Sequence, residues 1–142
     1  MRKKGIRTMR VSKAVGYAVR ALAYLANKGK GRRVTLSEIA KAEDIPEAYL
    51  VKVMKRLAAE CLVTIFRGSV GGYTLTRKAG DVTMLEVFEA IEGKLILRDC
   101  TESPLTCNRS KKCPARPVWI DLQSKVTDAF ARCTLAELSG AR

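Results

Sequence analysis

The sequence lacks histidine altogether, lacks long apolar runs, and contains no acidic residue before Glu38. Without histidine, the commonest general base, the Ser-His and Cys-His nucleophile pairs and every histidine-containing zinc site are excluded. No run approaches the roughly 18–20 apolar residues of a transmembrane helix, and no apolar signal core follows the basic start. There is also no C-x-x-C pair and no cofactor-binding loop. These absences argue against an enzyme and against a membrane protein, and we expect a cytoplasmic protein.

Basic residues outnumber acidic ones, and the excess lies in the first part of the chain. The 142 residues include 27 Lys/Arg and 14 Asp/Glu, a formal net charge of +13. Residues 1–80 hold 18 Lys/Arg and five Asp/Glu, whereas residues 81–142 hold nine of each. Such an asymmetric positive charge indicates an anionic partner, in the first place a nucleic acid.

Three helices are predicted within the first sixty residues. Apolar residues recur at helical spacing from Ser12 to the glycine-containing segment 27–31, and Thr35 and Glu38 have the spacing of a capping box for a second helix. Pro46 suits the first turn of a third helix. The expected buried stripe of this third helix consists of Tyr49, Leu50, Val53, Met54 and Leu57. The short turn between the last two helices is typical of a helix-turn-helix, whose second helix lies in the major groove.

A β-hairpin is predicted directly after the third helix. Residues 62–66 and 73–75 are rich in β-branched and aromatic side chains, which favours two short strands. The segment Arg67-Gly-Ser-Val-Gly-Gly72 between them has the composition of a hairpin tip. A helix-turn-helix followed by a hairpin is a winged helix, so the expected fold is mainly α with a small β-hairpin wing.

Two further helices and a short terminal one are predicted in the second half. Thr83 and Glu86 form a second capping box, and Gly93 marks the end of the helix that it opens. A longer helix follows, with an apolar stripe made of Val118, Leu122, Val126, Ala129 and Cys133, flanked by Trp119 and Phe130. Because a complete winged helix offers this stripe no partner, we predict that it pairs across a two-fold axis in a homodimer.

These elements divide the chain into three parts. We expect a basic N-terminal arm over residues 1–10 and a winged-helix DNA-binding region over residues 11–80. Residues 81–142 would then contain the helix that begins after Thr83, a three-cysteine loop over residues 99–114 and the C-terminal dimerisation helix.

Basic and polar residues of the predicted winged helix are the candidate contacts to double-stranded DNA. Lys and Arg on a recognition helix and wing neutralise phosphates and release counterions, and Arg67 is well placed to enter the minor groove. The candidate DNA-binding residues are Lys13, Arg20, Tyr49, Lys52, Lys55, Arg56, Arg67, Gly68 and Ser69.

Three of the five cysteines, Cys100, Cys107 and Cys113, lie within fourteen residues of one polar loop. Disulfides are rare in a reducing cytoplasm, and soft thiolate ligands favour an iron–sulfur cluster or zinc. A thiol switch is the remaining functional interpretation. Cys61 and Cys133, by contrast, lie beside apolar residues, and we expect both to be buried without a role in the site.

Several local motifs resemble those of the Rrf-type winged-helix regulators, the family of the iron–sulfur regulator IscR and the nitric oxide sensor NsrR. Residues 9–19 are similar to the family's opening, Tyr49-Leu50 and Arg67-Gly-x-x-Gly-Gly-Tyr73 match its most specific motifs, and the cysteine loop occupies its cluster position. The resemblance covers roughly residues 9–138. It implies a dimeric repressor or dual regulator that binds a palindromic operator and controls iron–sulfur cluster biogenesis or stress genes.

The resemblance also implies that Cys100, Cys107 and Cys113 hold a cluster, for which 2Fe–2S is favoured and 4Fe–4S is the alternative. IscR-like members take a fourth ligand from a histidine where this chain has Arg116, and NsrR-like members from an aspartate where it has Gly16. Asp99, Glu102, Arg116, solvent or a small thiol remain as the fourth ligand, with solvent or a thiol favoured because a guanidinium is a poor ligand. IscR-like members also carry a promoter-discriminating glutamate where this chain has Val51. The alternative function is a thiol-redox or zinc-switched winged-helix regulator without an iron–sulfur cluster.

Overall fold

Capping residues set the ends of the helices in the computed structural model, which describes residues 10–29 and 31–140. Ser12 caps α1 by accepting a hydrogen bond from the Val15 backbone N–H, and Gly29 ends that helix with φ of 94°. The elements are α1 (Lys13–Lys28), α2 (Leu36–Glu43), α3 (Glu47–Ala59), β1 (Val63–Phe66), β2 (Gly72–Leu75), η1 (Ala79–Asp81), α4 (Met84–Glu92), α5 (Asp99–Glu102), η2 (Pro104–Thr106), α6 (Arg116–Arg132) and α7 (Leu135–Gly140). The predicted basic arm lies outside the described residues apart from Arg10.

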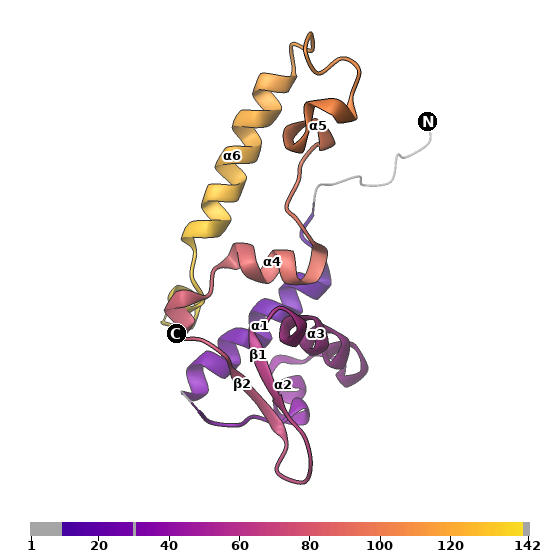
Figure 1. The fold of residues 1–142 in the computed structure, drawn as a ribbon. Helices are drawn as coiled ribbons and strands as arrows, with labels where there is room; N and C mark the ends of the chain where they lie inside the picture. Colours follow the sequence, from indigo (N-terminus) through magenta and orange to yellow (C-terminus); the bar gives the residue numbers. More distant parts are fainter. Residues whose placement is uncertain (1–9, 30, 141–142) are drawn as a thin grey trace, which may run out of the picture.

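The predicted winged helix is confirmed, with α1 at its centre (Figure 1). Helices α2, α3, α4 and α7 all pack against α1. The largest side chains of this core have less than 2% of their surface exposed, and they include Leu22, Ile39, Leu50, Met54 and Leu57. Burying each leucine or methionine side chain contributes about 1.5–3 kcal/mol, so this core holds α3 against α1 and α2.

The wing is an antiparallel pair that a third segment extends. Strand β1 pairs with β2 in the register Val63 to Leu75 through Phe66 to Gly72. Val34, in the connection between α1 and α2, exchanges two backbone hydrogen bonds with Tyr73, of 3.0 and 2.8 Å. The connection between α1 and α2 is therefore tied to the hairpin near its tip, at the second residue of β2, although the sequence indicated only the two strands.

Helix α6 stands outside the winged helix and joins it to the cysteine loop (Figure 1). It packs against α4 and α5, and none of its residues is buried. In the part of the chain that the structure describes, no helix has the length and apolar character needed to cross a bilayer.

The capping box that was predicted at the start of α4 is confirmed, because Thr83 and Glu86 each accept a hydrogen bond from the other's backbone N–H. Glu86 N–H donates to the Thr83 hydroxyl at 3.2 Å, and the Glu86 carboxylate accepts from the Thr83 backbone N–H at 3.0 Å and from Arg77 at 2.6 Å. Partial burial acts to raise the pKa of Glu86, but the Thr83 N–H and the Arg77 guanidinium outweigh it and hold that pKa below its ordinary value.

This lowered pKa predicts how stability depends on pH. A carboxyl whose folded pKa is depressed stabilises the fold above its unfolded pKa, about 4.3, and that contribution disappears as the pH falls through the folded value. We expect Glu86→Gln, which keeps the cap but removes the charge, to lower the free energy of unfolding at pH 7 by on the order of 0.5 kcal/mol. Urea unfolding at pH 7 and pH 3 measures the effect. A difference between the two proteins that is as large at pH 3 as at pH 7 would contradict it.

Candidate functional site

Two groups of candidate residues lie at opposite ends of the molecule. The wing is at one end, and the cysteine loop, residues 99–114, is at the other, with α4 and α6 between them (Figure 1). Helices α4 and α6 therefore connect the loop to the helix-turn-helix, since α6 packs against α5 and α4, and α4 packs against α1 and α3.

The recognition helix α3 exposes basic side chains on the side opposite its buried stripe. Lys52 and Lys55 are exposed, whereas Leu50, Val53, Met54 and Leu57 are buried. Tyr49 was predicted in the buried stripe, and that is wrong, because 43% of its surface is exposed. Its ring packs edge-on against Tyr17 of α1, with 5.2 Å between centroids, at the boundary of the core. An exposed tyrosine at the start of α3 stays a candidate for DNA contact.

Two of the candidate arginines are engaged within the protein. Arg56 donates a 2.8 Å hydrogen bond from Nη1 to the backbone carbonyl of Ile91, at the end of α4. Arg20 lies 3.6 Å from the Glu43 carboxylate and over the Tyr17 ring. Arg56 therefore fastens the recognition helix to α4, a role that its position among other basic residues did not reveal.

The remaining candidates are open to solvent. Arg67, Gly68 and Ser69 are exposed at the wing tip, where Gly68 has φ of 96° and accepts a 3.1 Å hydrogen bond from the Gly71 N–H. Lys13 is exposed in the first turn of α1. Lys13, Arg67 and Ser69 therefore have exposed side chains that can contact phosphates.

The cysteine loop is partly ordered by short helices. Cys100 lies in α5 and is half-buried, Cys107 follows η2 and is exposed, and Cys113 is half-buried before α6. Cys100 and Cys107 line one depression of about 390 Å³ together with Asp99, whereas Cys113 lines a separate one of about 420 Å³. Among the described residues, no three His, Cys, Asp or Glu side chains are grouped closely enough to hold a metal ion.

Hydrogen bonds to the backbone carbonyls of two cysteines order this loop. Arg116 donates from Nε to the Cys100 carbonyl at 3.2 Å, and the Ser110 N–H donates to the Cys107 carbonyl at 3.1 Å. Ser110 is only 6% exposed, and its hydroxyl oxygen is a buried side-chain atom without a hydrogen-bond partner. Buried hydroxyl groups normally have a partner, so Ser110 marks a place where the loop can gain an interaction.

Gln123 of α6 holds the segment that leads into the loop, and nothing in the apolar pattern indicated it. Its Oε1 accepts from the Leu97 N–H at 2.7 Å, and its Nε2 donates to the Leu95 carbonyl at 2.7 Å and to the Thr127 hydroxyl at 2.9 Å. One side chain thus satisfies two backbone groups of the connection between α4 and α5.

Replacement of Gln123 should release this connection. We expect Gln123→Leu to lower the free energy of unfolding by about 1–3 kcal/mol, because the Leu97 N–H and the Leu95 carbonyl lose their partner. Amide hydrogen exchange at Leu97 should become at least about tenfold faster. The exposed neighbour Ser124 provides the matched control, Ser124→Ala. Unchanged exchange at Leu97 in Gln123→Leu would contradict the assigned role.

The two other cysteines lie away from the loop. The expectation that Cys61 is buried is wrong, because Cys61 is exposed in the turn that ends α3, with φ of 59°. The Cys61 N–H donates to the Ala58 carbonyl and the Leu62 N–H to the Leu57 carbonyl, the bonds of a Schellman helix end, which turns the Cys61 side chain outward. Cys133 was also expected to be buried within the stripe of the long helix, but it is half-buried and follows the last residue of α6.

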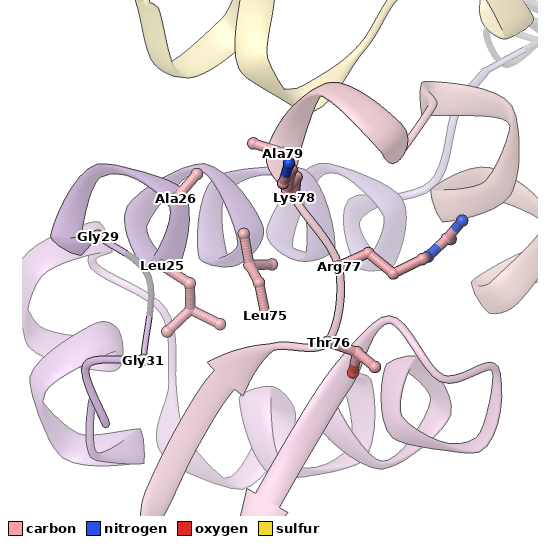
Figure 2. A pocket seen from close by; sticks show the side chains of 9 residues that line it. All are labelled: Leu25, Ala26, Gly29, Gly31, Leu75, Thr76, Arg77, Lys78 and Ala79. Carbon is pink, nitrogen blue, oxygen red and sulfur yellow. The ribbon is translucent and has the colours of Figure 1, made fainter.

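One pocket of about 390 Å³ lies between the end of α1 and the segment after β2 (Figure 2). Leu25 and Leu75 point into it, whereas Arg77 extends away from it toward Glu86. The pocket is therefore lined mainly by apolar groups, and it lies apart from both candidate surfaces.

Comparison with known proteins identifies the family. Residues 11–141 match the model of the Rrf2 family, described as iron-dependent transcriptional regulators. The chain is 31% identical to the HTH-type transcriptional regulator IscR of Citrobacter koseri over 130 residues, which are 92% of this chain and 79% of that protein.

Solved structures support the same assignment. The structure of T. potens IscR has a TM-score of 0.73 at 25% identity and covers 97% of this chain and 90% of its own. CymR, the global cysteine regulator of B. subtilis, has the same fold with a TM-score of 0.75 at 24% identity, over 95% of this chain and 99% of its own. The proteins of this family are transcription regulators and not enzymes, as the absence of catalytic residues predicted. The chain therefore belongs to the Rrf2 family of transcriptional regulators.

Proposed function

We propose that this chain is a cytoplasmic, homodimeric repressor or dual regulator that senses iron–sulfur cluster status and controls cluster biogenesis or stress genes. The observation that carries the proposal is the position of Cys100, Cys107 and Cys113, which all lie in the one segment that joins α4 to α6. The iron-dependent description of the family and the IscR relatives support it.

The donor chemistry of the loop fits a cluster. Three thiolates are soft ligands for iron, and Arg109, Lys112 and Arg116 lie beside them, where their positive charge would offset the negative charge of a thiolate-bound cluster. Cys100 and Cys107 already share one depression, and Cys113 would complete the set by a movement of the polar segment that contains Ser110. A 2Fe–2S cluster, or alternatively a 4Fe–4S cluster, would supply reversible one-electron chemistry and sensitivity to oxidants.

Contacts in the loop narrow the choice of the fourth ligand. Glu102 is ion-paired with Lys94 at 2.5 Å, and Arg116 is bonded to the Cys100 carbonyl. Asp99 lines the same depression as Cys100 and Cys107. Asp99 therefore ranks above Glu102 and Arg116 as a protein ligand, and solvent or a small thiol is the alternative from outside the chain.

A chain of contacts connects the cysteine loop to the recognition helix. Gln123 holds Leu95 and Leu97, on the connection that leads back to the end of α4. There Arg56 of α3 bonds the Ile91 carbonyl, and the Glu92 carboxylate accepts a hydrogen bond from Ser12, the cap of α1. A change in the loop would therefore move α4 against both α1 and α3.

DNA would be bound by the opposite end of the molecule. Lys52 and Lys55 of α3 would face the major groove, and Arg67 at the wing tip would enter the adjacent minor groove of the DNA. Two copies joined through the exposed apolar face of α6 would present two recognition helices to a palindromic operator, with half-sites about 34 Å apart.

Anaerobic purification tests the proposal. The protein should be brown and should contain iron and sulfide, and Mössbauer spectroscopy should identify the cluster type. Its affinity for one selected palindromic duplex should exceed that for random DNA by at least about a thousandfold at physiological salt. A colourless protein after anaerobic reconstitution would overturn the cluster assignment, and equal affinity for both DNAs would overturn the function as a specific regulator.

The alternative is a thiol or zinc switch without a cluster. The shared depression of Cys100 and Cys107 favours it, because two thiols on one surface can be oxidised together. Zinc without iron in elemental analysis, or operator affinity that changes with oxidant in the metal-free protein, would support this alternative.

A further inference from the structure

Arg33, in the connection between α1 and α2, contacts the wing from outside the helix-turn-helix. Its guanidinium carbon lies 3.8 Å from the ring centroid of Phe66, the last residue of β1. Its Nη1 donates a 3.1 Å hydrogen bond to the Val70 carbonyl in the wing tip, residues 67–71. One side chain therefore contacts the chain on both sides of Arg67, Gly68 and Ser69.

The backbone brings Arg33 to this place. Its neighbour Val34 pairs in both directions with Tyr73. Gly72 permits the close approach of the Arg33-Val34 backbone to β2, since a Cβ added at Gly72 would lie 3.0 Å from the Val34 carbonyl oxygen and 3.3 Å from the Arg33 Cβ. Gly72 also has φ of 149°, which disfavours other residues. The approach of Arg33 to the wing is thus built into the fold.

Apart from these contacts, the wing tip has one turn hydrogen bond of its own, from the Gly71 N–H to the Gly68 carbonyl. It consists of small or exposed residues, and Val70 has 72% of its surface exposed. Ordering a free backbone costs about 1–2 kcal/mol per residue, so a tip that is fixed before binding loses less entropy on the DNA. Stacking of an arginine on an aromatic ring and a hydrogen bond to a carbonyl supply that order.

We infer that Arg33 is a positioning residue for DNA binding, which holds the wing tip in the conformation that presents Arg67 to the duplex. The inference rests on the proposed DNA-binding role of the wing. Arg33 is exposed, but the face of its guanidinium lies on the Phe66 ring and its Nη1 donates to the Val70 carbonyl. We therefore expect its effect on binding to pass through the tip rather than through a phosphate contact of its own.

Conservative substitution of Arg33 distinguishes positioning of the wing tip from a direct phosphate contact. A phosphate contact needs positive charge, which Arg33→Lys keeps, whereas the stacked and hydrogen-bonded geometry needs the planar guanidinium. We expect Arg33→Lys and Arg33→Gln to weaken operator binding equally, by about tenfold, and Phe66→Leu to have a similar effect. The adjacent exposed Arg32, changed to Lys, is the matched control and should bind like the original protein.

A double-mutant cycle with Arg67→Ala completes the test. If Arg33 acts through the tip, Arg33→Lys should cause no further loss once Arg67 is removed, because the two changes affect one unit. Additive losses, or full retention of affinity in Arg33→Lys, would overturn the inference while the proposed function stands. Failure of the unsubstituted protein to prefer operator over random DNA would overturn the function itself. Melting temperatures of all variants establish that each one is folded.

Discussion

Cys107→Ala should yield a colourless protein that folds normally. Cys107 is exposed and follows η2, so removal of its thiol leaves no cavity in the core. The free energy of unfolding of the cluster-free protein should stay within about 0.5 kcal/mol of its original value. Iron and sulfide, by contrast, should fall to background after anaerobic reconstitution, because two cysteines hold too few of the ligands that a cluster requires.

Cys61→Ala is the matched control for this loss. It removes another exposed thiol, in the turn after α3 and outside the cysteine loop, and should leave the iron and sulfide content unchanged. Because Cys61 and Cys107 are both exposed, comparing the two alanine variants separates loss of an iron ligand from loss of a reactive thiol. Equal iron and sulfide in Cys107→Ala and the original protein would exclude Cys107 as a ligand.

Helix ends and apolar spacing made the winged helix predictable. Ser12, Thr83 and Gly93 act as caps through local hydrogen bonds, which depend on residues a few positions away. Tyr49 was placed in the buried stripe of α3 because an aromatic residue beside the stripe looks apolar, but it lies at the core boundary. Cys61 was expected inside because its neighbours are apolar, whereas the left-handed turn directs it outward.

Partners of charged and polar side chains were harder to predict than the fold. Arg56 has the spacing of a DNA contact, yet it bonds a carbonyl 35 positions away on α4. Gln123 and Arg33 likewise contact backbone groups that only the tertiary fold brings near. The three cysteines were recognisable as one group, but their distribution between two depressions depends on α5, η2 and the turn at Ser110, short elements without a periodic pattern.

Leu122→Glu should convert the protein into a monomer and abolish tight operator binding. Three residues of the predicted dimerisation stripe are exposed in the single chain, namely Val118 (55%), Leu122 (39%) and Ala129, whereas Val126 and Cys133 are half-buried. The side of α6 that packs against the rest of the chain carries Gln123 and Phe130. Gln123 donates to the Leu95 carbonyl, and the Phe130 ring packs edge-on against Phe88 of α4. A carboxylate at Leu122 would be buried without a partner in the dimer, which costs several kcal/mol, yet it would stay solvated in the monomer.

Loss of the dimer should weaken operator binding by about 10²- to 10⁴-fold, since a monomer loses the effective concentration that links the two half-sites. Sedimentation equilibrium measures the oligomeric state, and titration of the duplex measures the affinity. Ser124→Glu provides the matched control, because Ser124 is exposed on the side of α6 away from the stripe and should leave both quantities unchanged. A dimeric Leu122→Glu protein would show that another surface joins the two copies. Loss of binding in an intact dimer would show that α6 sets the spacing of the recognition helices and does not hold the copies together.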